Sequence, residues 1–213
     1  MADVFDVGAY ILRELGSPVS RHKLHKLLYY AQAWSLTLRG EPLFAEPVEA
    51  WREGPVVRRL YESHPGEKAP LESLPRGNAD VLSPAQRDVV QAVLAVYGEE
   101  DAETLIDRTH HEKPWRQARR GLPESAPSNE EISLESMASF YARSRERRAI
   151  DTALEKLVHT RFLEMRSARS RSNVSPEMVE YARRSLEDRS RLVKEDPERW
   201  AQRMTDRLAG ADD

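Results

Sequence analysis

The chain has 213 residues, and its composition already excludes several classes of protein. Hydrophobic residues make up 39% and charged residues 32%, against about 25% charged residues on average, which predicts a modest core beneath a strongly solvated surface. No stretch reaches the roughly 18 consecutive apolar residues that a membrane-spanning helix needs. The absence of cysteine excludes disulfides, thiolate nucleophiles and cysteine-ligated zinc. The first residues carry acids where an export signal carries basic residues, so we expect a cytoplasmic protein.

Charge divides the chain into two parts. Residues 1–142 carry 16 Lys and Arg against 22 Asp and Glu, a balance of −6, whereas residues 143–213 carry 17 against 14, a balance of +3. The second part also has few large apolar residues near its end. We therefore predict a compact domain over residues 1–142 and an arginine-rich helical extension over residues 143–213.

In chain order, the first predicted elements are two helices. An apolar stripe from Val4 to Leu15 predicts one helix, and a second is expected from near Ser20 to Gly40. The leucines and aromatic residues of the second helix make it the expected centre of the core. Prolines and a glycine then interrupt helical geometry, so residues 43–57 allow at most a short extended or β segment.

Further helices follow these irregular residues. Ser83 and Pro84 form a start signal for a helix that ends at Gly98, and shorter helices are predicted over 101–109, from Pro114, and from Ser133. In the extension, we expect a basic turn of helix over 143–148, an amphipathic helix over 150–165, and two more helices that start near Ser175 and Asp196. The fold class is therefore mainly α.

The sequence contains no recognisable catalytic or metal-binding pattern. There is no phosphate-binding or dinucleotide-binding glycine motif and no nucleophile elbow. His110 and His111 are adjacent, so on a helix they diverge by about 100° and cannot easily grip one ion. His22 and His25 could share a face, but no third ligand completes the set. We expect no catalytic, cofactor or metal site; a hydrolase that uses the region from His110 to Glu112 is an alternative.

The aromatic residues carry more information. Tyr29 and Trp34 are expected in the core, and Gly54-Pro55 is interpreted as a tight turn. Two interpretations stay open for a group beside the irregular segment, because aromatic and arginine side chains serve both as core anchors and as hot spots of protein interfaces. This group consists of Trp51, Arg52, Glu53 and Tyr61.

Four blocks in order resemble the Panacea domain, also called the SocA-like antitoxin domain. They are Lys23–Trp34, Gly40–Phe44, Glu49–Val57 and Thr109–Trp115, and the resemblance extends over roughly residues 4–142. It does not reach residues 143–213. The motif positions with an expected structural role are Lys26, Tyr29, Trp34, Gly54, Pro55, His110 and Trp115.

The resemblance implies a mainly α-helical antitoxin with no catalytic residues and a place in bacterial or phage defence. Such a protein neutralises a toxin encoded by the neighbouring gene, usually by direct binding; one branch of the family instead delivers its toxin to an AAA+ protease. We expect the toxin contacts to come from the loop around Arg52 and Glu53, with Trp51 and Tyr61, and from residues 62–80, or from the C-terminal extension, with Arg183 and Arg191.

An alternative function is DNA binding by an autorepressor of the operon. It depends on the arginine-rich stretch from Arg143 to Arg171, in which acids are interspersed and could form ion pairs along a solvated helix face. The sequence leaves open whether the chain forms a homo-oligomer and whether it binds DNA weakly. It predicts no membrane partner.

Overall fold

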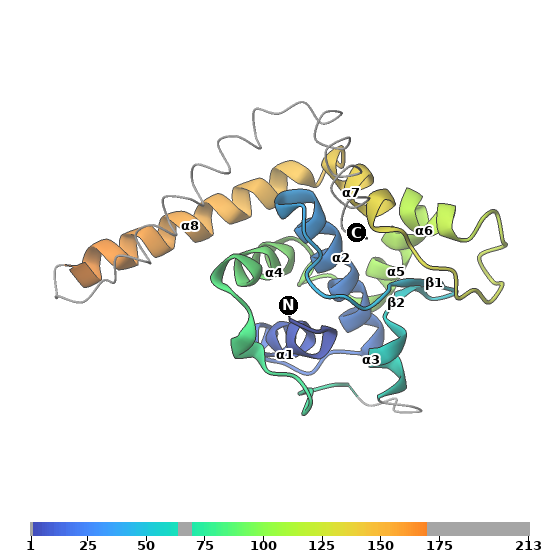
Figure 1. Cartoon of the computed structure of the whole chain (residues 1–213), viewed down its shortest axis with the longest axis horizontal. Helices are drawn as coiled ribbons and strands as arrows, with labels where there is room; N and C mark the ends of the chain where they lie inside the picture. The colour runs from blue at the N-terminus through green and yellow to red at the C-terminus, as the bar shows by residue number, and fades with distance from the viewer. Residues whose placement is uncertain (1, 64–69, 170–213) are drawn as a thin grey trace, which may run out of the picture.

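The computed structural model describes residues 2–63 and 70–169, and this part of the chain is mainly α-helical, as predicted (Figure 1). The helices are α1 (Val4–Leu15), α2 (Arg21–Arg39), α3 (Arg58–Glu62), α4 (Pro84–Tyr97), α5 (Ala102–His111), α6 (Lys113–Ala118), α7 (Leu134–Ala142) and α8 (Arg147–Arg169), with a 3-10 turn, η1, at Ala79–Val81. The strands are β1 (Glu49–Trp51) and β2 (Gly54–Val56).

Helix α2 lies at the centre of the molecule, with α1, α4, α5 and α7 packed around it (Figure 1). Every residue from Leu24 to Leu38 is buried, because the helix is enclosed on all sides rather than along one stripe. Its boundaries follow from local chemistry. The Ser20 hydroxyl accepts the N–H of Lys23 at the start, and Gly40 adopts the left-handed conformation that ends the helix.

The predicted extended segment is confirmed as a hairpin of β1 and β2. The strands are antiparallel, with Glu49 opposite Val56 and Trp51 opposite Gly54. The interpretation of Gly54-Pro55 as the tight turn is wrong, because both residues belong to β2 and the turn is formed by Arg52 and Glu53. A proline is tolerated here because a strand of a two-stranded hairpin has an edge that needs no N–H donor.

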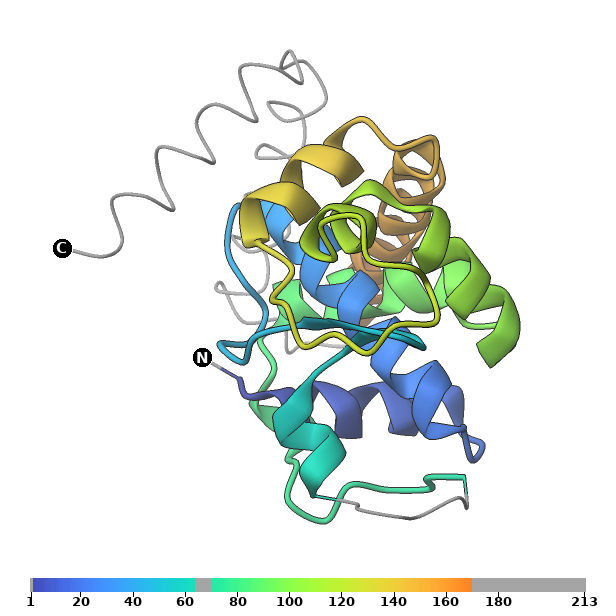
Figure 2. The ribbon, with the colours of Figure 1, turned by 90° about the vertical axis from the view of Figure 1, so that its right-hand side faces the viewer.

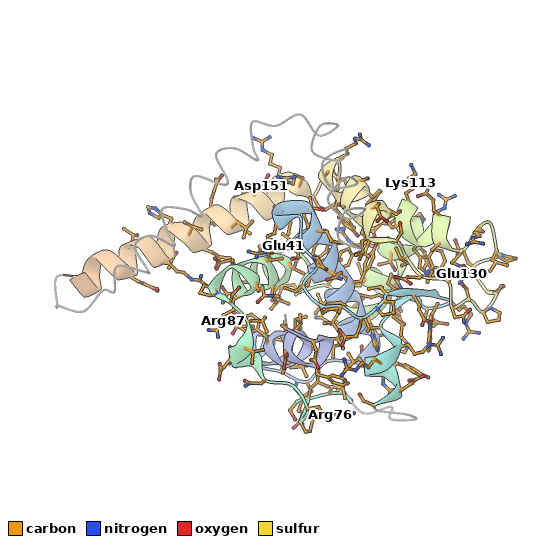
Figure 3. All side chains as sticks on the ribbon, in the orientation of Figure 1. Glu41, Arg76, Arg87, Lys113, Glu130 and Asp151 are labelled. Carbon is orange, nitrogen blue, oxygen red and sulfur yellow. The ribbon has the colours of Figure 1, made fainter. Side chains whose placement is uncertain are left out.

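The free edge of β1 is covered by the segment that leads into α7. The N–H of Ala50 donates to the carbonyl of Glu130 at 2.7 Å, and the N–H of Ile132 donates to the carbonyl of Val48 at 2.8 Å. Figure 2 shows this segment running beside the hairpin, and Figure 3 labels Glu130 on the same side of the molecule. The hairpin is therefore held between α2 and a loop from far along the chain.

Helix α8 contains the whole of the amphipathic helix predicted over 150–165 and the last two residues of the predicted basic turn. The prediction is wrong for residues 143–146, which form a turn in which the Ser144 hydroxyl accepts the N–H of Glu146. Ile150 and Leu154 of α8 join the core beside α4, and the helix then continues past α4 (Figure 1). The division of the chain at residue 142 stays a prediction.

Several expectations fall on residues that the structure does not describe. Arg183 and Arg191 lie outside the described residues, as do the helices predicted near Ser175 and Asp196. Of the helices that are described, none combines the length and the apolar character needed to cross a membrane.

Candidate functional site

A cleft of about 840 Å³ lies where the hairpin meets the first turns of α2. Its lining comes from four segments: the start of α2, the hairpin, α3, and the loop before α7. The lining residues are Ser20, Arg21, His22, His25, Lys26, Trp51, Arg52, Glu53, Val56, Tyr61, Pro127 and Ser128. The structure thus brings together the four candidate residues of the described chain, Trp51, Arg52, Glu53 and Tyr61, in one cleft.

Trp51 and Tyr61 form an aromatic wall of this cleft. Their ring centroids are 4.8 Å apart and the rings meet edge to face at 63°, a favoured arrangement for aromatic pairs. The guanidinium of Arg58 lies over the Trp51 ring at 5.2 Å, and that of Arg21 lies over the Tyr61 ring at 5.4 Å. Tyr61 is 36% exposed, so a large aromatic surface faces solvent at the cleft.

The carboxylate of Glu49 fixes the indole of Trp51. It accepts the indole N–H at 2.7 Å and two further hydrogen bonds from Arg58, at 2.8 and 2.7 Å. Burial raises the pKa of Glu49, but the hydrogen bonds from Arg58 and Trp51 outweigh burial and leave the pKa below its ordinary value. Glu49 therefore stays ionised and holds the aromatic wall in one orientation.

Helix α6 supports the same wall from behind. The indole N–H of Trp115 donates to the carbonyl of Trp51 at 2.9 Å, and the ring of His110 stacks on Trp115 with centroids 4.1 Å apart. Both residues belong to the motif positions that the sequence assigns a structural role. Their contacts fix the backbone of β1 at the point where the turn begins.

Arg119 ties the loop before α7 to the hairpin. The side chain is 1% exposed and lies over the ring of Trp115 at 4.7 Å. Its guanidinium donates to the carbonyls of Ala50, Pro123 and Ala126, at 3.0, 2.7 and 2.6 Å. Carbonyl acceptors from two separate segments are thus joined by one rigid donor group. This positions the loop whose next residues, 127 and 128, close the cleft.

Lys26 forms the floor of the cleft. The side chain is fully buried, and its ammonium donates to the carbonyl of Pro55 at 3.3 Å. Gly54 lies directly against it: a Cβ at Gly54 would be 2.5 Å from the Cε of Lys26 and 2.8 Å from the hydroxyl of Thr109. Gly54 also has a φ of 89°, which side chains other than glycine rarely adopt. The close approach of β2 to α2 therefore depends on glycine at this position.

Burial controls the protonation of the cleft. Desolvation lowers the pKa of Lys26 to about 7, although the charge of Glu53 opposes this shift. Desolvation also lowers the pKa of His22, and the nearby charge of Lys26 lowers it further. His25 accepts the N–H of Val57 on its Nδ1 at 3.3 Å, so a neutral ring carries its proton on Nε2.

A second ionisable group lies against α2, one turn beyond Lys26. The Glu112 carboxylate, between α5 and α6, accepts hydrogen bonds from the hydroxyls of Tyr29, Tyr30 and Tyr141 at 3.3, 3.2 and 2.6 Å. Desolvation raises the pKa of Glu112 to about 7, while the three hydroxyls partly oppose the shift. Trp34 lies in the same region, and its indole N–H donates to the hydroxyl of Tyr97. We call this group the tyrosine cluster.

The sequence does not predict the residues at the floor and mouth of the cleft, which are Lys26, His22 and His25. The sequence favours His22 and His25 as hydrogen-bonding residues at a helix end rather than as metal ligands, and it does not predict that Lys26 is buried beneath β2. Within residues 2–63 and 70–169, no group of three His, Asp or Glu side chains is arranged to hold a metal ion. A signal does exist in the sequence, because Lys26 interrupts an apolar run of the most strongly buried helix.

The fold and the cleft are those of a mainly α-helical domain with a hairpin at the edge of its main cleft. Residues 24–116 match the family model described as Antitoxin SocA-like, Panacea domain, which is the family that the resemblance names. The match is shorter than the resembling stretch 4–142, but it contains the hairpin, Tyr61 and Lys26. No match to the chain was found among curated proteins or among solved structures.

Proposed function

We propose that this chain is an antitoxin that neutralises a protein toxin by binding it directly, without catalysis. The toxin is the product of the neighbouring gene. The observation that carries the proposal is the cleft, which lies largely within the Panacea match. It presents Trp51, Tyr61 and arginine side chains, and neighbouring residues hold Trp51 in a fixed orientation. These are the residue types that dominate the free energy of binding at protein interfaces.

The geometry of the wall supports a binding role over a purely structural one. A side chain that serves only as a core anchor has no need to face a cleft, yet Tyr61 is partly exposed and Trp51 is half-buried. Trp51 is held by Glu49 and by the indole of Trp115, and Tyr61 packs edge to face on Trp51, so little side-chain entropy remains to be lost on binding. A volume of about 840 Å³ is enough for several side chains of a partner.

The described arginines favour a protein partner over DNA. Arg145 pairs with Glu146, Arg147 with Asp151, and Arg161 with Asp88. These ion pairs offset positive charge along the stretch on which a DNA-binding function would depend. Delivery of the toxin to an AAA+ protease is the other alternative, and it differs in one result: neutralisation would then require the protease.

Co-expression in a bacterial host tests the proposal. Trp51→Ala removes a supported aromatic side chain, and we expect it to weaken the complex about 30-fold or more and to abolish rescue of growth. Val81→Ala is the matched control, because Val81 is an exposed apolar residue on η1, outside the cleft lining. Circular dichroism melting of both variants shows that the fold is kept. The proposal fails if the neighbouring product is not toxic, or if Trp51→Ala rescues growth as well as the wild type.

A further inference from the structure

The cleft has an uneven distribution of charge. Its lining contains the basic or titratable side chains Arg21, His22, His25, Lys26 and Arg52. The acid among these described lining residues is Glu53, which forms an exposed ion pair with Arg52 at 2.9 Å. The rim of the cleft is thus close to neutral, whereas the part formed by α2 is basic.

The basic groups of α2 form two adjacent rows. Arg21 and His25 are four residues apart, and so are His22 and Lys26, which places each pair on one face of the helix. His22 is exposed at the mouth and Lys26 is buried at the floor. A group that enters the cleft therefore meets basic side chains from its mouth to its floor.

Lys26 is poorly compensated for a buried charge. An ammonium has three N–H donors, and among the described residues Lys26 makes one hydrogen bond, to the neutral carbonyl of Pro55 at 3.3 Å. Burial of a charge without an opposite partner is strongly unfavourable. An anion in the cleft would supply the missing partner.

We propose that the cleft receives an acidic side chain of the toxin, with the carboxylate beside His22 and Lys26 and neighbouring apolar residues packed on Trp51 and Tyr61. This inference rests on the proposed function and adds the chemistry of the bound segment. The aromatic wall would pack against the apolar residues of the bound segment, and the basic side chains of α2 would bind its carboxylate.

A protein carboxylate fits the cleft better than a nucleic-acid backbone does. Residues 1–142, which hold the whole cleft, carry a net charge of −6, and such a charge opposes the approach of a polyanion. A single carboxylate within an apolar segment avoids this repulsion and still meets the local basic rows.

Binding of a carboxylate couples to proton uptake. The titratable and charged groups around Lys26 are His22 and His25 on α2, Arg52 and Glu53 in the hairpin turn, and His110 on α5. The pKa values of His22 and His110 lie below their ordinary value, so both rings are already neutral above pH 7. A bound carboxylate favours the protonated form of every base beside it, so the part of the proton uptake that Lys26→Met removes reports on Lys26, whose pKa is about 7 in the free protein.

Calorimetric titration with the purified product of the neighbouring gene tests the inference. We expect the wild-type complex to be about tenfold weaker at pH 8.5 than at pH 6.5, with uptake of roughly 0.7 of a proton at pH 7.5, measured in two buffers of different ionisation enthalpy. Lys26→Met should weaken binding about tenfold at pH 6.5 and remove this proton uptake. Lys113→Met is the control, because Lys113 is an exposed lysine at the start of α6 (Figure 3).

Replacement of the toxin's acids one at a time, Asp→Asn and Glu→Gln, identifies the bound side chain. One position should lose most of its effect when combined with Lys26→Met. The acidic segment is ruled out if Lys26→Met binds as tightly as the wild type at both pH values while Trp51→Ala still loses binding. If neither variant affects binding, the proposed function fails as well, so the two failures are distinguishable.

Discussion

The ammonium of Lys26 and the carboxylate of Glu112 both lie against α2, yet their surroundings differ in one decisive respect. Glu112 is enclosed by three tyrosine hydroxyls that donate to it, whereas Lys26 donates to one carbonyl and borders a cleft. Burial moves the pKa of each group to about 7, from opposite directions. The tyrosine cluster is satisfied from within the chain, and the cleft is not. On the proposed function, this difference separates a group that belongs to the fold from one that meets the partner.

The two groups also oppose each other as pH changes. The pKa of Glu112 is raised in the folded chain, so its contribution to stability is full below pH 4.5 and is lost as the pH rises through about 7. The pKa of Lys26 is lowered, so its destabilising effect is full below about pH 7 and fades as the pH rises toward 10.5. Together they make the folded chain least stable near neutral pH.

The largest effect is expected from Gly54→Ala, which disrupts the cleft and spares the tyrosine cluster. The new Cβ would clash with the buried side chains of Lys26 and Thr109 at a φ of 89°, so either these side chains or β2 must shift. We expect a loss of about 3 kcal/mol in the free energy of unfolding, measured by urea denaturation. Gly121→Ala is the control, since Gly121 also has a positive φ, of 81°, but open space around its Cβ position. Equal losses for the two variants would contradict the account of close approach.

A smaller effect of opposite sign is expected from Lys26→Met. Methionine fills a similar volume without a charge, so the variant should be about 1–3 kcal/mol more stable than the wild type at pH 7. The wild type should gain about 2 kcal/mol between pH 7 and pH 9 as Lys26 loses its proton, and the variant should not. Denaturant melts at the two pH values measure both. A wild-type stability that is flat over this range would show that Lys26 is not held as a buried, deprotonating amine.

The smallest effect is expected from Glu112→Gln. Glutamine keeps an acceptor for the tyrosine hydroxyls but cannot ionise, so it should remove the wild-type loss of stability between pH 5 and pH 8. Glu112 as a whole is half-buried, so solvent lessens this loss to about 1–2 kcal/mol. Thermal melts across this range check the difference, and binding to the toxin should stay unchanged. A loss of binding in this variant would mean that the tyrosine cluster is not purely architectural.

The fold could be predicted from the sequence because its signals are local. The apolar stripe of α1, the caps at Ser20, Gly40 and Ser83, and the left-handed Gly16 each depend on residues within one or two turns. The four cleft residues around the hairpin could also be nominated, because aromatic and charged side chains beside an irregular segment are visible in the sequence alone.

The floor of the cleft and the tyrosine cluster could not be predicted in the same way. The burial of Lys26 is caused by β2, which lies about 30 residues later in the chain, so the apolar residues around Lys26 do not by themselves predict it. The hydroxyls around Glu112 come from α2 and α7, which are distant from it in sequence. The turn was misplaced for a related reason: the sequence Gly54-Pro55 is typical of turns, but the packing of Gly54 on Lys26 places it in a strand.

Hydrogen–deuterium exchange of the complex with the neighbouring gene product tests the central claim most directly. If the cleft binds the toxin, protection should appear in the first turns of α2, in β1 and β2, and in α3, while the amides around the tyrosine cluster keep the exchange rates of the free protein. Protection confined to α8, with the hairpin and α3 unchanged, would contradict the assignment of the cleft as the binding surface.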